Sequence, residues 1–159
     1  MKNKGFTFYF KGILLSLCIV TLVMFFNQAF ASNAELVKSK IIQQANSMGV
    51  DPAIVLSIAK VESGFRQEAR GAGGPVGVFQ LMPSTARGMG YNPYELDQNI
   101  KCGITYYKNL YNRFGSMEKA VAAYNLGPAP VMRCNCVPQS AQGFVSRIMK
   151  DYRYYKAQM

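Results

Sequence analysis

From residue 32 onward, hydrophobic positions recur at the three-to-four-residue spacing of helices, and no convincing stretch alternates between hydrophobic and polar residues as a strand would. A first helix is predicted to start at Ser32 or Asn33 and to end at Gly49, because these residue types cap helices. A second is predicted to start at Asp51-Pro52, where proline occupies the first helical position. Its residues are apolar on almost every side, so this helix is expected to be buried.

Glycine and proline separate the remaining predicted helices. A glycine-rich loop covers residues 71–77, and a short helical stretch is predicted for residues 78–82. A long amphipathic helix is predicted for about residues 97–114, and another after Ser116. Residues 126–139, rich in proline and cysteine, are predicted to form a loop before a last amphipathic helix. The pattern therefore predicts a mostly α, single domain.

The N-terminus has the pattern of a signal peptide. Lysines come first, residues 12–26 are almost entirely apolar, and small residues at positions 29 and 31 mark a cleavage site after Ala31. We therefore expect residues 1–31 to be removed and residues 32–159 to form an exported, periplasmic domain. A retained membrane anchor is the alternative, but the apolar run is shorter than the roughly 20 residues that span a bilayer.

Charge and residue types narrow the chemistry. The formal net charge of +10 becomes +7 without residues 1–31, because three lysines and no acidic residue leave with them. A basic exported domain suits a polyanion such as the bacterial cell wall, and nucleic acid is not expected as a partner because Lys and Arg form no run. The chain contains no histidine, which excludes Ser-His-Asp and Cys-His catalysis and histidine-based zinc sites. Neither a metal nor a cofactor is expected, and proton chemistry must come from carboxylates, tyrosine or lysine.

Glu62 has an unusual setting for a carboxylate. It lies at the end of the apolar second helix and is followed by Ser63-Gly64-Phe65, which is expected to hold it partly out of water. Desolvation raises a carboxyl pKa toward the value that a general acid needs near neutral pH. An ordinary surface glutamate near a helix end is the competing interpretation, which this setting alone does not exclude.

Four motifs follow one another along the chain from Glu62 onward. They are Glu62-Ser63-Gly64-Phe65, Gly77-Val78-Phe79-Gln80-Leu81-Met82-Pro83-Ser84-Thr85-Ala86, Asn99-Ile100 with Gly103, and Ala123-Tyr124-Asn125-Leu126-Gly127. Together they resemble the soluble lytic transglycosylase family, whose motifs read E-S-x-F, G-L-M-Q-x-x-P-x-T-A, N-I-x-x-G and A-Y-N-x-G. The resemblance covers about residues 36–130 and implies a lysozyme-like, goose-type-like fold.

The resemblance also implies a peptidoglycan lytic transglycosylase with Glu62 as its single catalytic acid and base. Glu62 would protonate the glycosidic oxygen between N-acetylmuramic acid and N-acetylglucosamine, and the muramyl C6 hydroxyl would then close a 1,6-anhydro ring. Contacts to the glycan strand are implied for Phe79, Gln80, Met82, Tyr124 and Asn125. Core packing is the alternative for Phe79 and Met82, a buried and satisfied hydroxyl for Tyr124, and a helix-end role for Asn125.

Three positions depart from the family pattern. Gly71 stands where the family often has a serine that orients the N-acetyl group, so this contact must be missing or supplied by another residue. Phe79 replaces the usual methionine and Pro75 a usual alanine, which would reshape the groove. None of these departures involves the acid.

Two other functions remain open. Glycoside hydrolysis normally uses two carboxylates, and Glu68 is the only acid close to Glu62 in sequence, which favours the transglycosylase over a hydrolysing muramidase. The other alternative, a module that binds peptidoglycan without cutting it, has no need of a desolvated acid. The small size resembles that of the specialised transglycosylases that accompany secretion, conjugation or pilus assembly complexes, so such a complex is a candidate partner.

Cleavage after Ala31 would leave three cysteines, Cys102, Cys134 and Cys136, in a compartment that permits disulfides. A bond between the last two would span only one residue. We therefore expect Cys102, in the long helix, to pair with one of them and to tie the Pro-rich segment to the body of the domain. Three free thiols are the alternative.

Overall fold

The computed structural model describes residues 23–24 and 33–159 of the chain. The chain divides into two units, Met1–Leu36 and Val37–Met159. The described residues of the first unit are helical, and the predicted signal peptide lies outside the described residues except for residues 23–24. Within the part of the chain that is described, no helix has the length and apolar character needed to cross a membrane.

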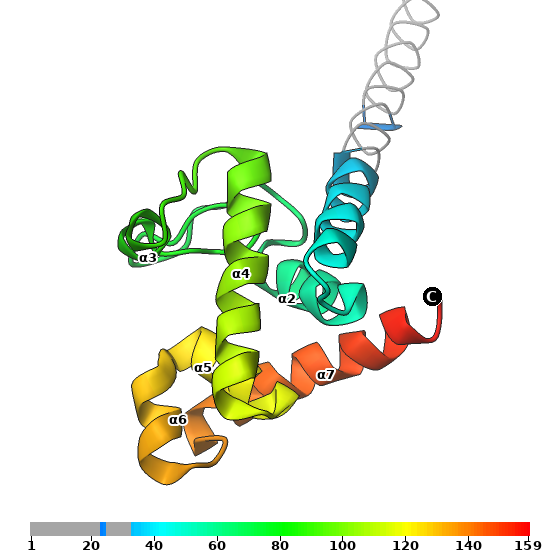
Figure 1. The fold of residues 1–159 in the computed structure, drawn as a ribbon. Coiled ribbons are helices and arrows are strands. Elements are labelled where there is room, and N and C mark those ends of the chain that lie inside the picture. Colours follow the sequence, from blue (N-terminus) through cyan, green and yellow to red (C-terminus); the bar gives the residue numbers. More distant parts are fainter. Residues whose placement is uncertain (1–22, 25–32) are drawn as a thin grey trace, which may run out of the picture. The chain divides into compact units, whose positions relative to one another are not determined.

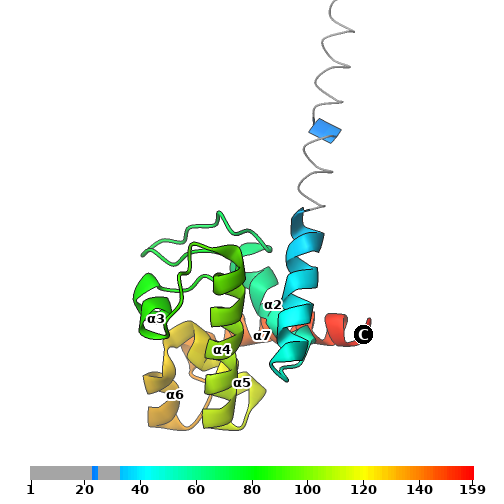
Figure 2. The same ribbon diagram turned by 45° about the horizontal axis from the view of Figure 1, so that its top comes forward.

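Residues 37–159 consist of helices joined by loops, without a strand. After the helical residues 37–47 come α2 (Pro52–Ser63), α3 (Pro83–Gly88), α4 (Leu96–Phe114), α5 (Met117–Leu126), α6 (Pro128–Cys134), the 3-10 helix η1 (Gln139–Ala141) and α7 (Gln142–Lys156). Helix α4 runs through the middle of this unit, with α3 beside one half of it and α5 and α6 at its other end (Figures 1 and 2). The predicted mostly α architecture is confirmed.

Helix α2 is the buried helix that its sequence predicts. The Asp51 side chain accepts a hydrogen bond from the Ala53 backbone N–H at 3.0 Å, and Gly64 ends the helix in the left-handed conformation at φ 61°. All residues from Ala53 to Ala59 are buried. Burial of apolar side chains on every side, more than helix propensity, therefore stabilises α2.

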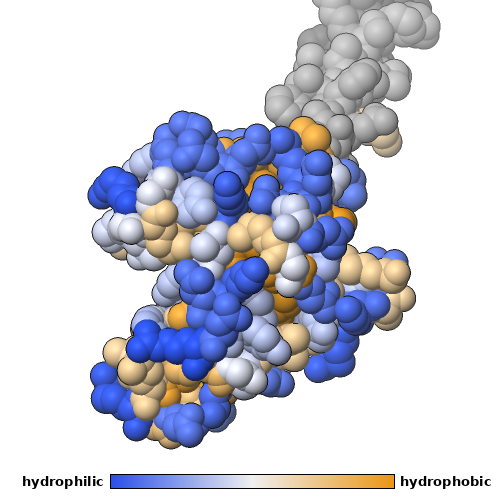
Figure 3. Space-filling model, viewed as in Figure 1, coloured by the Kyte–Doolittle hydropathy of each residue, from blue (hydrophilic) through white to orange (hydrophobic). Residues whose placement is uncertain are grey.

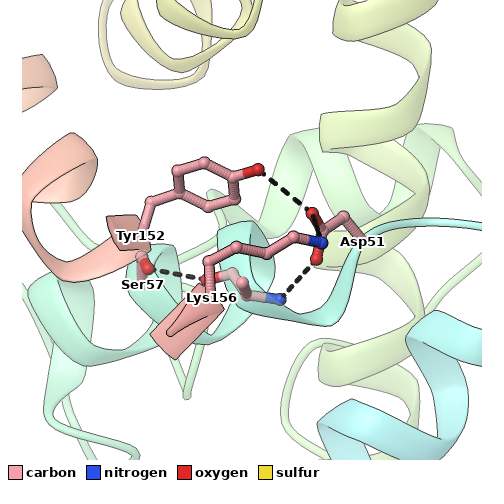
Figure 4. A network of polar contacts seen from close by, with 5 residues as sticks. Asp51, Ser57, Tyr152 and Lys156 are labelled. Atoms are coloured by element: carbon pink, nitrogen blue, oxygen red, sulfur yellow. Dashed lines mark hydrogen bonds and ion pairs between the residues drawn. The ribbon is translucent and has the colours of Figure 1, made fainter. Parts of the chain in front are cut away.

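Helix α7 packs along α2 in the opposite direction. At the start of α2, Asp51 accepts hydrogen bonds from the Tyr152 hydroxyl at 3.2 Å and from Lys156 Nζ at 2.8 Å (Figure 4). Near the end of α2, Lys60 Nζ pairs with Asp151 at 2.7 Å. Such ion pairs at the surface add little stability. They show the register of the two helices, which places the first half of α7 beside the end of α2.

Residues 76–80 enter the interior without forming a helix or a strand, and side chains satisfy several of their backbone groups. Asn99, which is fully buried in α4, provides two of these hydrogen bonds and a third to Pro93. Its Oδ1 accepts from the Phe79 N–H at 3.0 Å. Its Nδ2 donates to the carbonyl oxygens of Val76 at 3.0 Å and Pro93 at 2.9 Å.

Two glycines give this segment the space to approach α4. A Cβ atom at Gly77 would lie 2.6 Å from Asn99 Cγ, and a Cβ atom at Gly103 would lie 2.6 Å from Phe79 Cβ. Contacts that short do not occur between real side chains, so both positions require glycine. The Phe79 side chain consequently fills the space above Gly103 and is completely buried.

The observed helix boundaries can be compared with four of the segments predicted from the sequence. The helices predicted for residues 97–114 and after Ser116 are confirmed as α4 and α5. Residues 78–82 are not helical, because Gln80 adopts a left-handed φ of 44° and the helix starts only at Pro83. The loop predicted for residues 126–139 is also wrong, since it contains α6, which Pro128 starts at its first position.

The predicted disulfide of Cys102 is wrong as well. Cys134 and Cys136 are bonded to each other, with their Cα atoms 5.1 Å apart, and Cys102 is a free thiol. The intervening Asn135 has a left-handed φ of 49°, which turns the chain back at the exposed end of α6. Cys102 lies instead on the buried face of α4 and is completely inaccessible.

The role of Asn99 leads to a prediction about stability. Replacing it by alanine (Asn99→Ala) leaves the Phe79 N–H buried without a partner, and we expect the free energy of unfolding to fall by about 2–4 kcal/mol. Urea unfolding followed by circular dichroism measures this. The matched control is Asn109→Ala on the exposed side of the same helix, for which a change within about 0.5 kcal/mol is expected. Equal losses in the two variants would contradict the prediction.

Candidate active site

The end of α2 forms part of the wall of a cavity of about 550 Å³. The cavity lies between the segment that leads into α3, helix α4, and the junction of α5 with α6; Figure 3 shows the surface hollowed between α3 and the α5–α6 region. The residues that line it are Glu62, Ala72, Pro75, Gln80, Leu81, Met82, Thr85, Tyr106, Tyr124, Asn125, Leu126 and Gly127.

Glu62 is the only carboxylate among the lining residues in the described part of the chain. Helix α2 places it half-buried against the cavity. Burial raises the pKa of its carboxyl group from 4.5 to about 7, although the positive charge of Arg147 acts in the opposite direction. A carboxyl group with this pKa is present in both protonation states near neutral pH, so it can donate a proton and accept one.

Arg147 lies on α7, on an exposed part of the helix. The antiparallel register of α2 and α7 brings it near Glu62, and its guanidinium group interacts electrostatically with the carboxylate. It escaped the sequence analysis because a single arginine on an amphipathic helix is indistinguishable from any other solvated charge. Only the pairing of the two helices identifies its position.

Side chains from α2 and α5 also form hydrogen bonds with the backbone of residues 76–80. Ser63 Oγ, at the end of α2, donates to the carbonyl oxygen of Val78 at 2.8 Å. The Tyr124 hydroxyl, from α5, donates to the carbonyl oxygen of Phe79 at 2.9 Å. The Tyr124 ring lines the cavity, but its hydroxyl is directed to this backbone carbonyl, which is the alternative considered for this residue.

Gln80 lines the cavity in an unusual backbone conformation. Its φ of 44° is rarely adopted by residues other than glycine and stores strain, as is common at functional sites. Its Nε2 donates to the carbonyl oxygens of Ala69 at 3.2 Å and Gly77 at 2.9 Å. Its Oε1 is therefore the group that remains to accept a hydrogen bond from a ligand.

Of the other three residues expected to bind the glycan, two line the cavity and one does not. Met82 lies on the cavity wall and is 45% exposed, and Asn125 lies on the wall at the end of α5 and is exposed. Phe79 does not line the cavity, because its side chain is buried against Gly103. The expectation that Phe79 contacts the glycan is therefore wrong, and only its carbonyl oxygen takes part in the site, as the acceptor for Tyr124.

Gly71 and the lining residue Pro75 depend on each other, because their atoms share the same space. A Cβ atom at Gly71 would lie 2.6 Å from Pro75 Cγ and 2.7 Å from Gln80 Oε1. No serine can therefore stand at position 71 while Pro75 and Gln80 keep their places. The contact that serine provides in the resembled family is therefore either missing here or made by another residue.

Tyr106 is the most informative lining residue that the sequence analysis missed. It comes from α4, and its ring lies against that of Tyr124 with 5.1 Å between the centroids and 55° between the planes. It follows Gly103 by three residues, so both lie on the same face of α4. That spacing was the signal that could have indicated Tyr106.

The fold and the cavity define a lysozyme-like helical domain with one carboxylate in its groove. The chain belongs to the Transglycosylase SLT domain family, whose pattern matches residues 39–142. Among solved structures, the lytic transglycosylase Slt of Pseudomonas aeruginosa is similar over 76% of this chain and 24% of its own, with a TM-score of 0.68 and 23% identity. The 70 kDa soluble lytic transglycosylase of Escherichia coli has a TM-score of 0.64 and 24% identity, over 74% of this chain and 24% of its own.

Proteins that are similar in sequence are also named as transglycosylases. A transglycosylase of Enterobacteria phage PRD1 is 33% identical over 79 residues, which are 49% of this chain and 30% of the phage protein. The membrane-bound lytic murein transglycosylase F of Desulfosudis oleivorans is 29% identical over 110 residues, 64% of this chain and 24% of that protein. This chain thus spans less than a third of the length of either relative.

The raised pKa of Glu62 predicts how stability depends on pH. The unfolded chain ionises this group at about 4.5 and the folded chain at about 7, so its contribution to stability is present below pH 4.5 and is lost as the pH rises to 7. Glu62→Gln cannot ionise. We expect this variant to be more stable than the wild type at pH 8, by on the order of 3 kcal/mol, and equally stable at pH 4.

Urea unfolding at the two pH values tests this expectation. Glu68→Gln is the matched control, because this exposed carboxylate lies outside the cavity and its removal should change stability little at either pH. A Glu62→Gln variant that is no more stable than the wild type at pH 8 would refute the burial of the charge.

The contact between Gly71 and Pro75 predicts coupled substitutions. Gly71→Ala should lower the free energy of unfolding by about 1–3 kcal/mol, because its Cβ atom displaces Pro75 or Gln80. Pro75→Ala removes the Cγ atom, so the double variant should recover about 1 kcal/mol of that loss. A double-mutant cycle in urea measures the coupling, and strictly additive effects would show that the two positions are independent.

Proposed function

We propose that this chain is a peptidoglycan lytic transglycosylase that cleaves the β-1,4 bond between N-acetylmuramic acid and N-acetylglucosamine. The observation that carries the proposal is the carboxyl group of Glu62, half-buried in the wall of the cavity with its pKa raised to about 7. Membership of the SLT domain family and the names of its relatives support the same reaction. The cavity of about 550 Å³ opens at the surface hollow between α3 and the α5–α6 region, where a sugar chain could enter.

In the first step, protonated Glu62 donates its proton to the glycosidic oxygen, and the bond to C1 of the muramyl residue breaks. The N-acetylglucosamine leaves with a new hydroxyl group. In the second step, the Glu62 carboxylate removes the proton of the muramyl C6 hydroxyl, whose oxygen bonds to C1. The 1,6-anhydro ring is closed, and Glu62 is protonated again. One residue with a pKa near 7 suits both steps.

The absence of a second acid supports this reaction over hydrolysis. Glycosidases that use water normally need two carboxylates on opposite sides of the bond. Glu62 is the only acidic residue in the cavity wall as the described residues form it, and Glu68 does not line it. Without a second carboxylate to activate water on the other side of the bond, the internal C6 hydroxyl is the nucleophile that we propose.

Gln80, Met82, Tyr124 and Asn125 would form the surface that holds the sugars. Gln80 Oε1 is placed to accept a hydrogen bond from the glycan, and Met82 and the Tyr124 ring provide apolar surface on the walls. We further propose that residues 1–31 direct export and that residues 32–159 act in the periplasm. A phage transglycosylase is among the relatives, and a secretion, conjugation or pilus assembly complex is the partner that we propose.

Digestion of purified sacculi, with the products identified by mass, tests the proposal. Anhydro-muropeptides are expected. Muropeptides with a reducing end would indicate a hydrolysing muramidase, and wall-bound protein without any released product would indicate a binding module.

The role of Glu62 gives the decisive variant. Glu62→Gln keeps the shape of the side chain and removes its proton, so we expect cleavage to become undetectable while the circular dichroism spectrum stays that of the wild type. Glu68→Gln should keep most of the activity. Product formation by folded Glu62→Gln would show that another group is the acid, and loss of activity in Glu68→Gln would support a two-carboxylate hydrolase.

A further inference from the structure

Tyr106 and Tyr124 both line the cavity, but only the Tyr124 hydroxyl has a hydrogen-bond partner among the described residues. Tyr124 is 8% exposed, and its hydroxyl is engaged by the carbonyl oxygen of Phe79. Tyr106 is half-buried in the same wall, and its hydroxyl forms no hydrogen bond with any residue in the described part of the chain. No buried side-chain polar atom of the described residues lacks a partner, so the Tyr106 hydroxyl is an accessible one. It is therefore free to bind a ligand in the cavity that Tyr106 lines.

The protonation state of Tyr106 defines what it can offer. Burial raises the pKa of its hydroxyl above the ordinary value of 10, so the group remains protonated throughout the neutral range. It is a hydrogen-bond donor next to an open cavity. The Tyr124 ring, 5.1 Å away between centroids, fixes its orientation from behind.

Gln80, which lines the same cavity, offers an acceptor. Both hydrogens of Gln80 Nε2 are used by backbone carbonyls, which leaves Oε1. Gly71 provides no side chain, and Pro75 and Gln80 leave no space for one. An acetamido group carries one N–H donor and one carbonyl acceptor. Gln80 Oε1 can accept from the N–H, and the carbonyl needs a donor, which the Tyr106 hydroxyl can provide.

We propose that Tyr106 is a substrate-contacting residue whose hydroxyl donates a hydrogen bond to the carbonyl oxygen of an N-acetyl group in the cavity. This inference rests on the proposed function, because it names the contact by which that site distinguishes N-acetylated sugars. It assigns to α4 the contact that a serine at position 71 cannot make here. Tyr124, in contrast, holds the backbone and supports Tyr106.

The test uses a β-1,4-linked tetramer of N-acetylglucosamine with ¹³C-labelled acetamido carbonyl groups, bound to the Glu62→Gln protein so that no cleavage occurs. In this background we expect Tyr106→Phe to weaken binding roughly tenfold, as one lost hydrogen bond does. The carbonyl resonance that shifts on binding should lose that shift. Tyr111→Phe, on the exposed part of α4 outside the cavity, is the matched control and should leave both unchanged.

A second measurement separates contact from fold. Because the Tyr106 hydroxyl has no partner among the described residues, Tyr106→Phe should unfold at the same urea concentration as the wild type. Tyr124→Phe should unfold earlier, because the Phe79 carbonyl loses its donor, and should retain the shifted carbonyl resonance.

Two results would overturn the inference: unchanged affinity in Tyr106→Phe, or weakened affinity with the carbonyl shift intact. Failure of the proposed function gives a different result, because the parent protein would then neither bind the tetramer nor, with Glu62 present, release products from sacculi.

Discussion

The active-site region depends on one constraint, which is that the backbone of residues 76–80 crosses the interior without regular secondary structure. Unpaired buried backbone groups are costly, and side chains satisfy several of those that find no backbone partner here. Asn99 from α4 takes the N–H of Phe79, and Tyr124 from α5 takes its carbonyl oxygen. Ser63 from α2 takes the preceding carbonyl. Three helices thus meet on five residues, and their positions are coupled through these hydrogen bonds.

These hydrogen bonds also fix the position of the candidate acid, because Glu62 immediately precedes Ser63. The apolar helix behind it raises its pKa, and the charge of Arg147 limits that effect. Gly71 and Pro75 form an interdependent pair against the Gln80 side chain, and together they remove a side chain from the groove while the polar contacts of the buried segment remain in place.

The amino-acid sequence determined the features that arise from interactions within a few residues. Helices α2, α4 and α5 follow from caps, apolar spacing and terminal glycines, all of which act locally. The half-buried position of Glu62 in the cavity wall follows from an apolar helix that ends at that point. The order of the motifs was enough to indicate the family, since each motif is a contiguous stretch of chain.

Tertiary structure alone decided which side chains face the cavity. Phe79 belongs to a contiguous motif, but the space above Gly103 on α4 draws it into the core. Tyr106 and Arg147 reach the site because α4 and α7 pack against elements distant in sequence. Cys102 is kept from its expected partners by its place on the buried face of α4. The physical reason is the same in each case: hydrophobic periodicity shows that a face is buried, and only packing specifies what it is buried against.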